Sequence, residues 1–217
     1  MARSDDIRDG IIDTALALGE RHASWEAVRL HEVAAELNIT LDEVRRHFRD
    51  KDALADAWLD RADAAMLVQA QAAGFVALFP RERLQRLITA WLEALAPHRK
   101  LTRQMIYGRF EAGRLHLQLP GLIRVSRTVQ WLREAAQRDT TFQRRVLEES
   151  GLAALYLMTF LCWLEDDSRG AERTHRFLER SLKAAEQLDH WLCAGRGRAA
   201  RRAPTPAAGP AADEPTL

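Results

Sequence analysis

The residues best placed to do chemistry lie in one short stretch, Arg29–Leu54, with the sequence RLHEVAAELNITLDEVRRHFRDKDAL. Basic side chains gather in its second half, and such side chains neutralise phosphates and donate hydrogen bonds to base edges. Thr40 stands three residues before Glu43, which is the spacing of a capping box at the start of a helix. A helix that closes at Leu37, a tight turn and a second helix capped at Thr40 together predict a helix-turn-helix.

A helix-turn-helix places its second helix in the major groove of DNA. The candidate DNA-binding residues are Thr40, Leu41, Arg45, Arg46, His47 and Lys51. The alternative is that the basic cluster forms a solvated face paired with Asp42, Asp50 and Asp52. Residues 1–66 carry nine basic and fifteen acidic side chains, a net charge of −6, and this field opposes binding to a polyanion.

Motifs that carry enzyme chemistry are absent from the sequence, including the dinucleotide fingerprint, the P-loop, GxSxG, HExxH and CxxC. The seven His are scattered without the spacing of metal ligands. Glu165, Asp166 and Asp167 beside Ser168 could hold a divalent cation, but such residues between two helices are more typical of a helix cap. We therefore expect no catalytic residue, no metal and no cofactor.

Large apolar side chains are the candidates for a ligand pocket between helices and for a subunit interface. The expected pocket residues are Trp91, Met105, Phe110, Trp131, Tyr156 and Phe160, with simple core packing as the alternative. A second stripe should form a homodimer interface through the last two helices. Its residues are Phe177, Leu178, Leu182 and Leu188.

The elements that must position these residues are all helical, because apolar residues recur at helical spacing and no segment alternates like a strand. The pattern predicts three short N-terminal helices, a helix over 81–96, a loop over 111–121, and helices near 122–137, 141–164 and 171–193. The fold class is therefore all-α. The expected division is a helix-turn-helix domain over 1–54, a helical ligand-binding and dimerisation domain over 55–193, and a disordered tail over 194–217.

Composition sets further bounds on the 217-residue chain, which is 47% hydrophobic and has a formal net charge of +1. The longest nearly uncharged run, 151–164, is shorter than the roughly 20 residues of a membrane-spanning helix. Two Cys cannot make a disulfide framework, and the charged N-terminus lacks the apolar stretch of a secretory signal. These features favour a protein of the cytoplasm.

Residues 11–54 resemble the DNA-binding domain of the tetracycline-repressor (TetR) family of bacterial regulators. The resemblance rests on IIDTALAL, VAAEL, the turn NIT, and HFRDKDAL. It implies DNA-facing or phosphate-contacting places for Thr40, Arg46, His47 and Lys51. It also implies a helical second domain that dimerises, so the expected function is a transcriptional regulator that binds operator DNA and responds to a hydrophobic small molecule.

Residues 96–188 are also similar to the lipid-binding accessory protein family of coenzyme Q biosynthesis, which uses a TetR-like fold. The segments that carry this resemblance are APHRK, RTVQWLREAAQRDTTFQRR and LYLMTFLCWLEDDSRGAERTHRFLERSL. The positions that match the family pattern are Trp163, Leu164, Asp167, Ser168, Thr174, Phe177 and Leu178. The alternative function is therefore a lipid-binding accessory protein whose helix-turn-helix no longer binds DNA.

Overall fold

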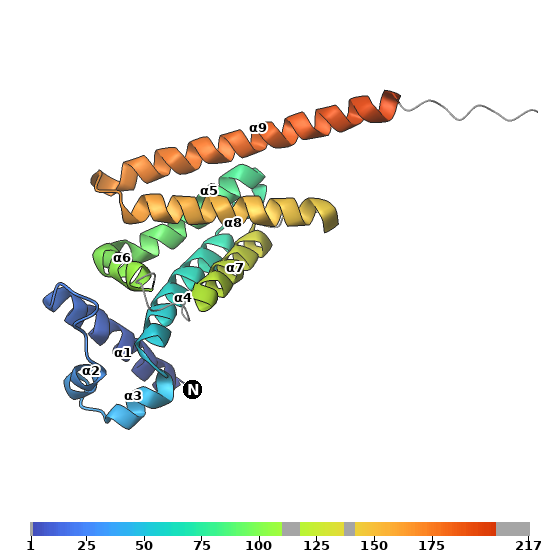
Figure 1. Ribbon diagram of the computed structural model, residues 1–217. Helices are drawn as coiled ribbons and strands as arrows, with labels where there is room; N and C mark the ends of the chain where they lie inside the picture. The colour runs from blue at the N-terminus through green and yellow to red at the C-terminus, as the bar shows by residue number, and fades with distance from the viewer. Residues whose placement is uncertain (1, 110–117, 137–141, 203–217) are drawn as a thin grey trace, which may run out of the picture.

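The computed structural model describes residues 2–109, 118–136 and 142–202, and these residues form helices joined by turns without a strand (Figure 1). The helices of the N-terminal half are α1 (Ala2–Arg21), α2 (Leu30–Glu36), α3 (Leu41–His47), α4 (Lys51–Ala70), η1 (Phe75–Ala77), α5 (Pro80–Leu95) and η2 (Ala96–His98). Those of the remainder are α6 (Arg99–Gly108), α7 (Gln118–Ala135), α8 (Phe142–Leu164), η4 (Arg169–Ala171) and α9 (Glu172–Arg202). The predicted all-α class is confirmed.

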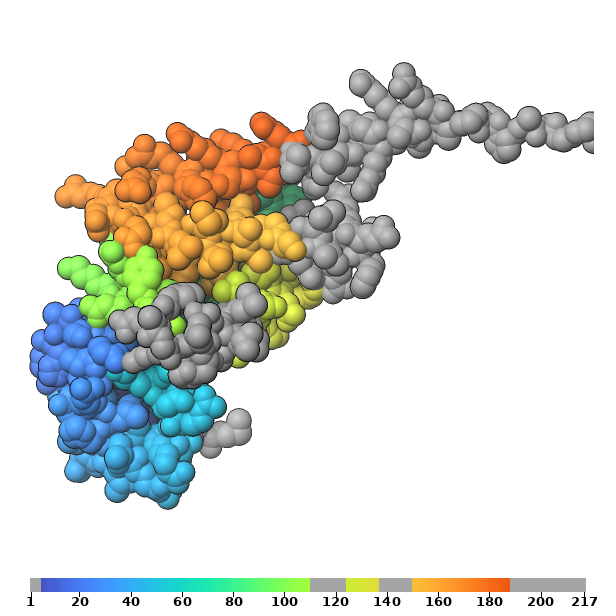
Figure 2. All heavy atoms as spheres, in the orientation of Figure 1, coloured from blue at the N-terminus to red at the C-terminus, as the bar shows by residue number. Residues whose placement is uncertain are grey.

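Helices α1, α2 and α3 form a small N-terminal module at one end of the molecule, while α8 and α9 lie side by side at the other (Figures 1 and 2). Helix α4 runs from the module into the larger helical domain and packs most extensively on α5. It therefore crosses the expected domain boundary at residue 54 as one continuous helix. Helix α4 therefore connects the N-terminal module directly to the helical domain.

The core of the N-terminal module includes Ile11, Val33, Val44 and Phe48, all buried. Between α2 and α3 the backbone of Asn38 has a φ of 52°, a left-handed conformation that Asn tolerates better than most residues. The Ile39 amide donates to the Ala34 carbonyl at 3.0 Å, which closes the turn. The predicted helix-turn-helix is thus present.

Two helix boundaries differ from the sequence-based prediction. Helix α7 begins at Gln118, four residues earlier than expected, because Pro120 lies within its first turn, where a missing amide hydrogen costs nothing. Helix α9 extends to Arg202, so residues 194–202 are helical where a disordered tail was expected. This stretch is rich in Ala and Arg, which are strong helix formers, and residues 203–217 lie outside the described part of the chain.

Candidate functional site

The outer face of α3 is well exposed. The side chains of Arg45 and Arg46 are 73% and 64% exposed, and Leu41 is 52% exposed. Val44 on the opposite face is fully buried and fixes the helix on the module. A helix held in this way by one apolar face presents its other face as a rigid unit, which is what insertion into a DNA groove requires.

The start of α3 is fixed by a side-chain cap. The Thr40 hydroxyl oxygen accepts a hydrogen bond from the Glu43 amide at 3.1 Å, so the first half of the predicted capping box is confirmed. The Glu43 carboxylate lies instead 2.7 Å from Arg46 and 3.6 Å from the Nε2 atom of His47. The Thr40 hydroxyl is therefore used to cap the helix backbone. Thr40 lies at the exposed start of α3, next to Leu41.

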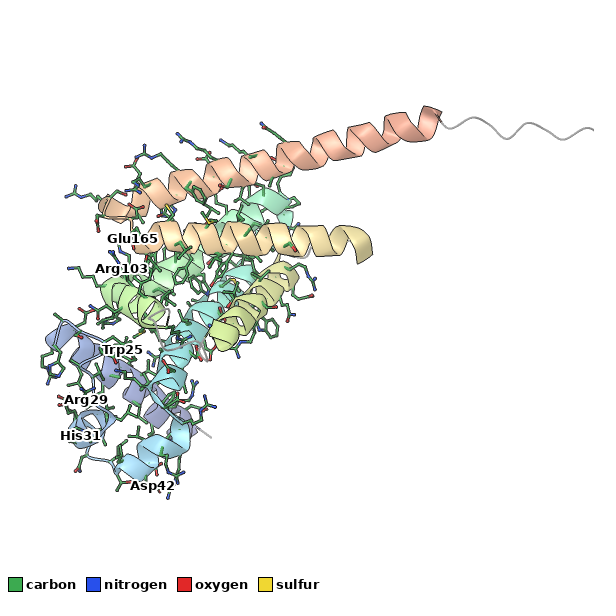
Figure 3. The ribbon with its side chains drawn as sticks, in the orientation of Figure 1. Trp25, Arg29, His31, Asp42, Arg103 and Glu165 are labelled. Atoms are coloured by element: carbon green, nitrogen blue, oxygen red, sulfur yellow. The ribbon has the colours of Figure 1, made fainter. Side chains whose placement is uncertain are left out.

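Carboxylates on α3 pair with its own arginines. Arg45 lies 2.9 Å from the Oδ1 atom of Asp42, and Arg46 lies 2.9 Å from its Oδ2 atom. The hydrogen bond from Arg45, together with the charge of Arg46, lowers the pKa of Asp42. Pairs as exposed as these contribute little to stability, so their arginines can exchange a carboxylate for a phosphate at small cost. The position of Asp42 at the outer edge of the module is seen in Figure 3.

Two residues of the expected DNA-binding set point elsewhere. The Lys51 ammonium donates to the carbonyls of Trp25 and Glu26 at 3.1 and 3.2 Å and lies 5.6 Å from the Trp25 ring. It ties the loop after α1 to the start of α4. The His47 side chain is only 12% exposed and lies against Glu43. The structure thus brings together Thr40, Leu41, Arg45 and Arg46 but turns His47 and Lys51 toward the protein.

Exposed polar residues at the start of α2 were not in the predicted set. Arg29 and His31 are exposed on the same outer end of the module as Asp42 (Figure 3). The Arg29 guanidinium donates to the carbonyl of Glu26 at 3.0 Å. The resemblance predicted DNA contacts only from the second helix of the helix-turn-helix, α3, and from the residues after it. Predicting Arg29 and His31 from the sequence would have required knowing which face of α2 is buried in the module.

A joint built on α6 connects the N-terminal module to the helical domain. The Gln104 carbonyl oxygen accepts from the Trp25 amide at 2.6 Å, and its amide group donates to the Ala23 carbonyl at 3.2 Å. Leu101 packs against Gly19, where an added Cβ would lie 2.9 Å from the leucine side chain. Hydrogen bonds and close packing therefore couple α6 to the end of α1.

The expected ligand-pocket residues form a packed cluster in the described structure. The centre of the Trp91 ring lies 5.2 Å from that of Tyr156 and 5.0 Å from that of Phe160, and both contacts are edge to face. All three residues are buried. Met105 is buried as well, whereas Trp131 is 48% exposed and lies on the surface. Phe110 lies outside the described residues. Aromatic contacts fill the centre of this cluster, which favours the core-packing alternative for its buried members.

A buried polar network lies beside this cluster and joins α4, α5 and α7. Asp63 accepts hydrogen bonds from the Trp91 indole at 2.7 Å, from Arg124 at 3.0 Å and from the Thr128 hydroxyl at 3.1 Å. Burial raises the pKa of Asp63, an effect that the charge of Arg124 partly offsets. Arg124 also pairs with Asp60 on α4. The network fixes the angle between α4 and α7.

The expected dimer stripe is directed into the chain. Leu178 and Leu182 are buried within the single chain, whereas Phe177 is half-buried. The side chain of Leu188 is outside the described set. Leu157 and Met158 on α8 are exposed apolar residues. Sequence periodicity identified the apolar faces of the two helices but not which of them the chain covers itself.

The acidic turn between α8 and α9 acts as a helix cap. Asp166 is fully buried and accepts from the Ser168 amide and hydroxyl at 2.9 and 2.6 Å. It also accepts from the Thr174 amide and hydroxyl at 2.8 and 2.7 Å. Burial alone would raise the pKa of Asp166, but these four hydrogen bonds lower it well below its usual range. The cap expected here is confirmed for Asp166.

Residues 2–109, 118–136 and 142–202 contain no group of three or more His, Cys, Asp or Glu that could hold a metal ion. Within the same residues, no helix has the length and apolar character needed to cross a membrane.

The chain is similar in sequence and fold to known proteins. The COQ9 family model matches residues 142–189, which span α8 and the first half of α9. No match was found among curated proteins. The chain is similar to the crystal structure of the TetR transcriptional regulator from Nitrosomonas europaea ATCC 19718, with 50% sequence identity and a TM-score of 0.74, over 84% of this chain and 99% of that one. The chain belongs to the TetR family of transcriptional regulators.

A second TetR structure supports the fold at much lower identity. The TetR transcriptional regulator from Rhodococcus sp. RHA1 has a TM-score of 0.62 at 18% identity, covering 84% of this chain and 96% of that chain. The expected family membership is confirmed by the match at 50% identity. The match of the COQ9 model to 142–189 agrees with part of the second resemblance, which covered residues 96–188.

Proposed function

We propose that this protein is a TetR-type transcriptional regulator that binds operator DNA through α3 and responds to a hydrophobic small molecule. The observation that carries the proposal is the exposed face of α3, with Thr40 as its cap and Arg45 and Arg46 extending from it. Its role is binding rather than catalysis. Action on chromosomal DNA would place the protein in the cytoplasm.

The charge of the module determines how this binding should behave. Because residues 1–66 carry a net charge of −6, the attraction to phosphate is local to α3 and its neighbours. Arg45 and Arg46 must leave Asp42 and Glu43 in order to reach DNA. Affinity is therefore expected to depend on a few phosphate contacts made near α3 together with contacts to bases, and each phosphate contact should add to its fall with added salt.

A homodimer would present two copies of α3 to two half-sites about 34 Å apart along the DNA. The outer faces of α8 and α9 lie at the opposite end of the molecule from α3, and the exposed Leu157 and Met158 on α8 offer an apolar surface for a second copy (Figure 1). Burial of this surface in a symmetric contact would leave both N-terminal modules free to meet the same face of a duplex.

Ligand response would act through the elements that join the two parts. Helix α4 is continuous between them, and α6 contacts the end of α1 through Gln104 and Leu101. A ligand that binds one arrangement of these helices better than another would change the separation of the two α3 helices in the dimer. Such a shift alters affinity for paired half-sites without any contact between ligand and DNA.

The test is a gel-shift or anisotropy titration with DNA that flanks the protein's own gene. We expect specific retardation of the wild type and a log-log salt slope near −0.9 for each phosphate contact. The double variant Arg45→Ala and Arg46→Ala should lose at least tenfold in affinity. Arg169→Ala together with Arg176→Ala, on the far side of the molecule, removes the same charge and should bind as the wild type does. Equal binding by the two double variants, or no retardation of the wild type at low salt, would overturn the proposal.

A second candidate function is lipid binding without DNA binding. The COQ9 model match over 142–189 favours it, as do the carboxylates of Asp42 and Glu43, which neutralise the arginines of α3. Organic extraction of the natively purified protein followed by mass spectrometry distinguishes the candidates. A stoichiometric lipid in a protein that retards no DNA would support this second function.

A further inference from the structure

A cleft of about 620 Å³ lies on the side of the helical domain nearest the end of α1. Its walls come from the end of α5, from η2 and the start of α6, and from the turn between α8 and α9. Leu92, Pro97, Trp163 and Ala171 give it apolar walls. This volume falls within the range of roughly 300–1,000 Å³ that is typical of small-molecule sites. The cleft is not lined by Trp91, Tyr156 or Phe160, although Trp163 in its wall stacks on Phe160 with ring centroids 6.1 Å apart.

Basic side chains line the same cleft. Arg99, Lys100 and His175 all contribute to its walls. The Arg99 guanidinium lies 5.7 Å from the centre of the Trp163 ring, and within the described residues neither Arg99 nor Lys100 forms an ion pair. An arginine held over an indole keeps its edge hydrogens available, since the ring occupies only the face of the guanidinium. Beside an apolar wall, the cleft thus offers two cations that no carboxylate of the described residues neutralises in an ion pair.

The acidic residues of the cleft offset part of this charge. Glu20 and Glu93 also line it, and the Glu20 carboxylate lies 3.1 Å from the Nδ1 atom of His98. The near balance of charge means that a small inorganic anion gains little here. An anion with an apolar body gains from both the walls and the cations, because removal of apolar area from water supplies most of the free energy.

We propose that this cleft binds an amphipathic organic anion, with its carboxylate or phosphate at Arg99 and Lys100 and its apolar chain against Leu92, Pro97 and Trp163. The cleft reaches Glu20 in the last turn of α1, next to the joint between α6 and Gly19. Its occupant therefore touches the N-terminal module and the helical domain at once. The effect of this ligand on DNA rests on the proposed function, whereas its binding does not.

Isothermal titration calorimetry of the full chain without DNA tests the proposal. The probes are dodecanoate, dodecyl phosphate and dodecanol at concentrations below micelle formation, and inorganic phosphate as the charge alone. We expect saturable binding of one dodecanoate or dodecyl phosphate per chain, at least tenfold tighter than dodecanol, and no binding of inorganic phosphate. The tighter of the two amphiphiles identifies the headgroup.

Variants locate the site. Arg99→Gln should weaken dodecanoate binding at least fivefold, whereas Arg103→Gln, one turn further along α6 and paired with Glu165, should leave it unchanged. Ala96→Trp, which fills the cleft from an exposed position, should abolish binding while circular dichroism remains that of the wild type. Equal affinity for dodecanol and dodecanoate, or unchanged binding by Arg99→Gln and Ala96→Trp, would overturn the proposal. A protein that binds dodecanoate in this way but retards no DNA would overturn the proposed function alone.

Discussion

Arginine and aspartate meet in two regions of this molecule under opposite conditions. On α3, Arg45 and Arg46 pair with Asp42, and all three side chains are more than half exposed to water. Between α4 and α7, Arg124 meets Asp63 where both side chains are more than nine-tenths buried. Water screens the first set, so these ions can exchange partners at small cost, whereas the second set is buried in a hydrogen-bonded network with Asp60, Trp91 and Thr128 and becomes part of the scaffold. The same residue types are thus exposed and exchangeable in one place and buried and fixed in the other.

The buried pair should give the largest effect when it is broken. Arg124→Ala leaves the Asp63 carboxylate buried without its cation, and we expect a loss of about 3–5 kcal/mol in the free energy of unfolding at pH 7, measured by urea denaturation. Burial raises the pKa of Asp63. Loss of the arginine should raise it further, so the deficit should shrink as the pH falls and the carboxyl becomes protonated.

Arg127→Ala is the matched control for Arg124→Ala, because Arg127 contacts Asp60 from a half-exposed position on the same helix. It should cost less than about 1 kcal/mol. Similar losses for the two variants would erase the distinction between buried and exposed pairs.

Loss of the cap at Asp166 should give the second-largest decrease in the free energy of unfolding. Asp166→Ala removes the acceptor of four hydrogen bonds in the turn between α8 and α9, and we expect a loss of about 2–3 kcal/mol by denaturation. The pKa of Asp166 is lowered in the fold. Its contribution is therefore complete above the ordinary aspartate pKa of about 4 and disappears as the pH falls toward the lowered value.

Asp167→Ala, which changes the exposed neighbour, controls for the charge of the acidic turn. It should keep both the stability and the acid sensitivity of the wild type. If Asp166→Ala retained the same decline in stability below pH 4, another carboxyl would be responsible for it.

The joint between α1 and α6 should give a smaller loss. In Gly19→Ala the new Cβ would lie 2.9 Å from a Leu101 methyl, so α6 or the leucine must shift, at a cost toward the lower end of the ~1–3 kcal/mol typical of overpacking. Gly10→Ala is the control on the same helix, because its Cβ would meet only Leu37, at 3.8 Å. It should stabilise α1 by up to about 1 kcal/mol through helix propensity. Opposite signs in thermal melts would confirm the close contact, and equal melting temperatures would contradict it.

The exposed pairs of α3 should give the smallest change in stability. Arg46→Ala is expected to alter the free energy of unfolding by no more than about 0.5 kcal/mol. A loss above 2 kcal/mol would mean that the α3 pairs hold the fold together and cannot be released to a ligand. The exposed pairs of α3 would then stabilise the fold as the buried pair does, and the contrast between the two regions would be wrong.

Local sequence determined the features that depend on neighbours along the chain. The cap at Thr40, the turn through Asn38 and the end of α8 at Leu164 were all predictable, since they follow from hydrogen bonds and backbone preferences within a few residues. Family membership followed from the same stretch, because short motifs such as HFRDKDAL record this local geometry. The apolar faces of the helices were predictable for the same reason.

Tertiary structure alone decided what covers each of those faces. Helical spacing places Leu178 and Leu182 on one stripe, but only the packing of α9 on α5 and α8 shows that the chain buries them itself. Lys51 was expected to contact phosphate, and only the fold shows that the carbonyls of Trp25 and Glu26 lie within its reach. Trp131 lies on the surface, while Asp63 and Arg124, unremarkable in sequence, meet in the interior. Periodicity specifies an angle about a helix axis, whereas burial and ion pairing depend on elements distant in the chain, and only the complete fold supplies these.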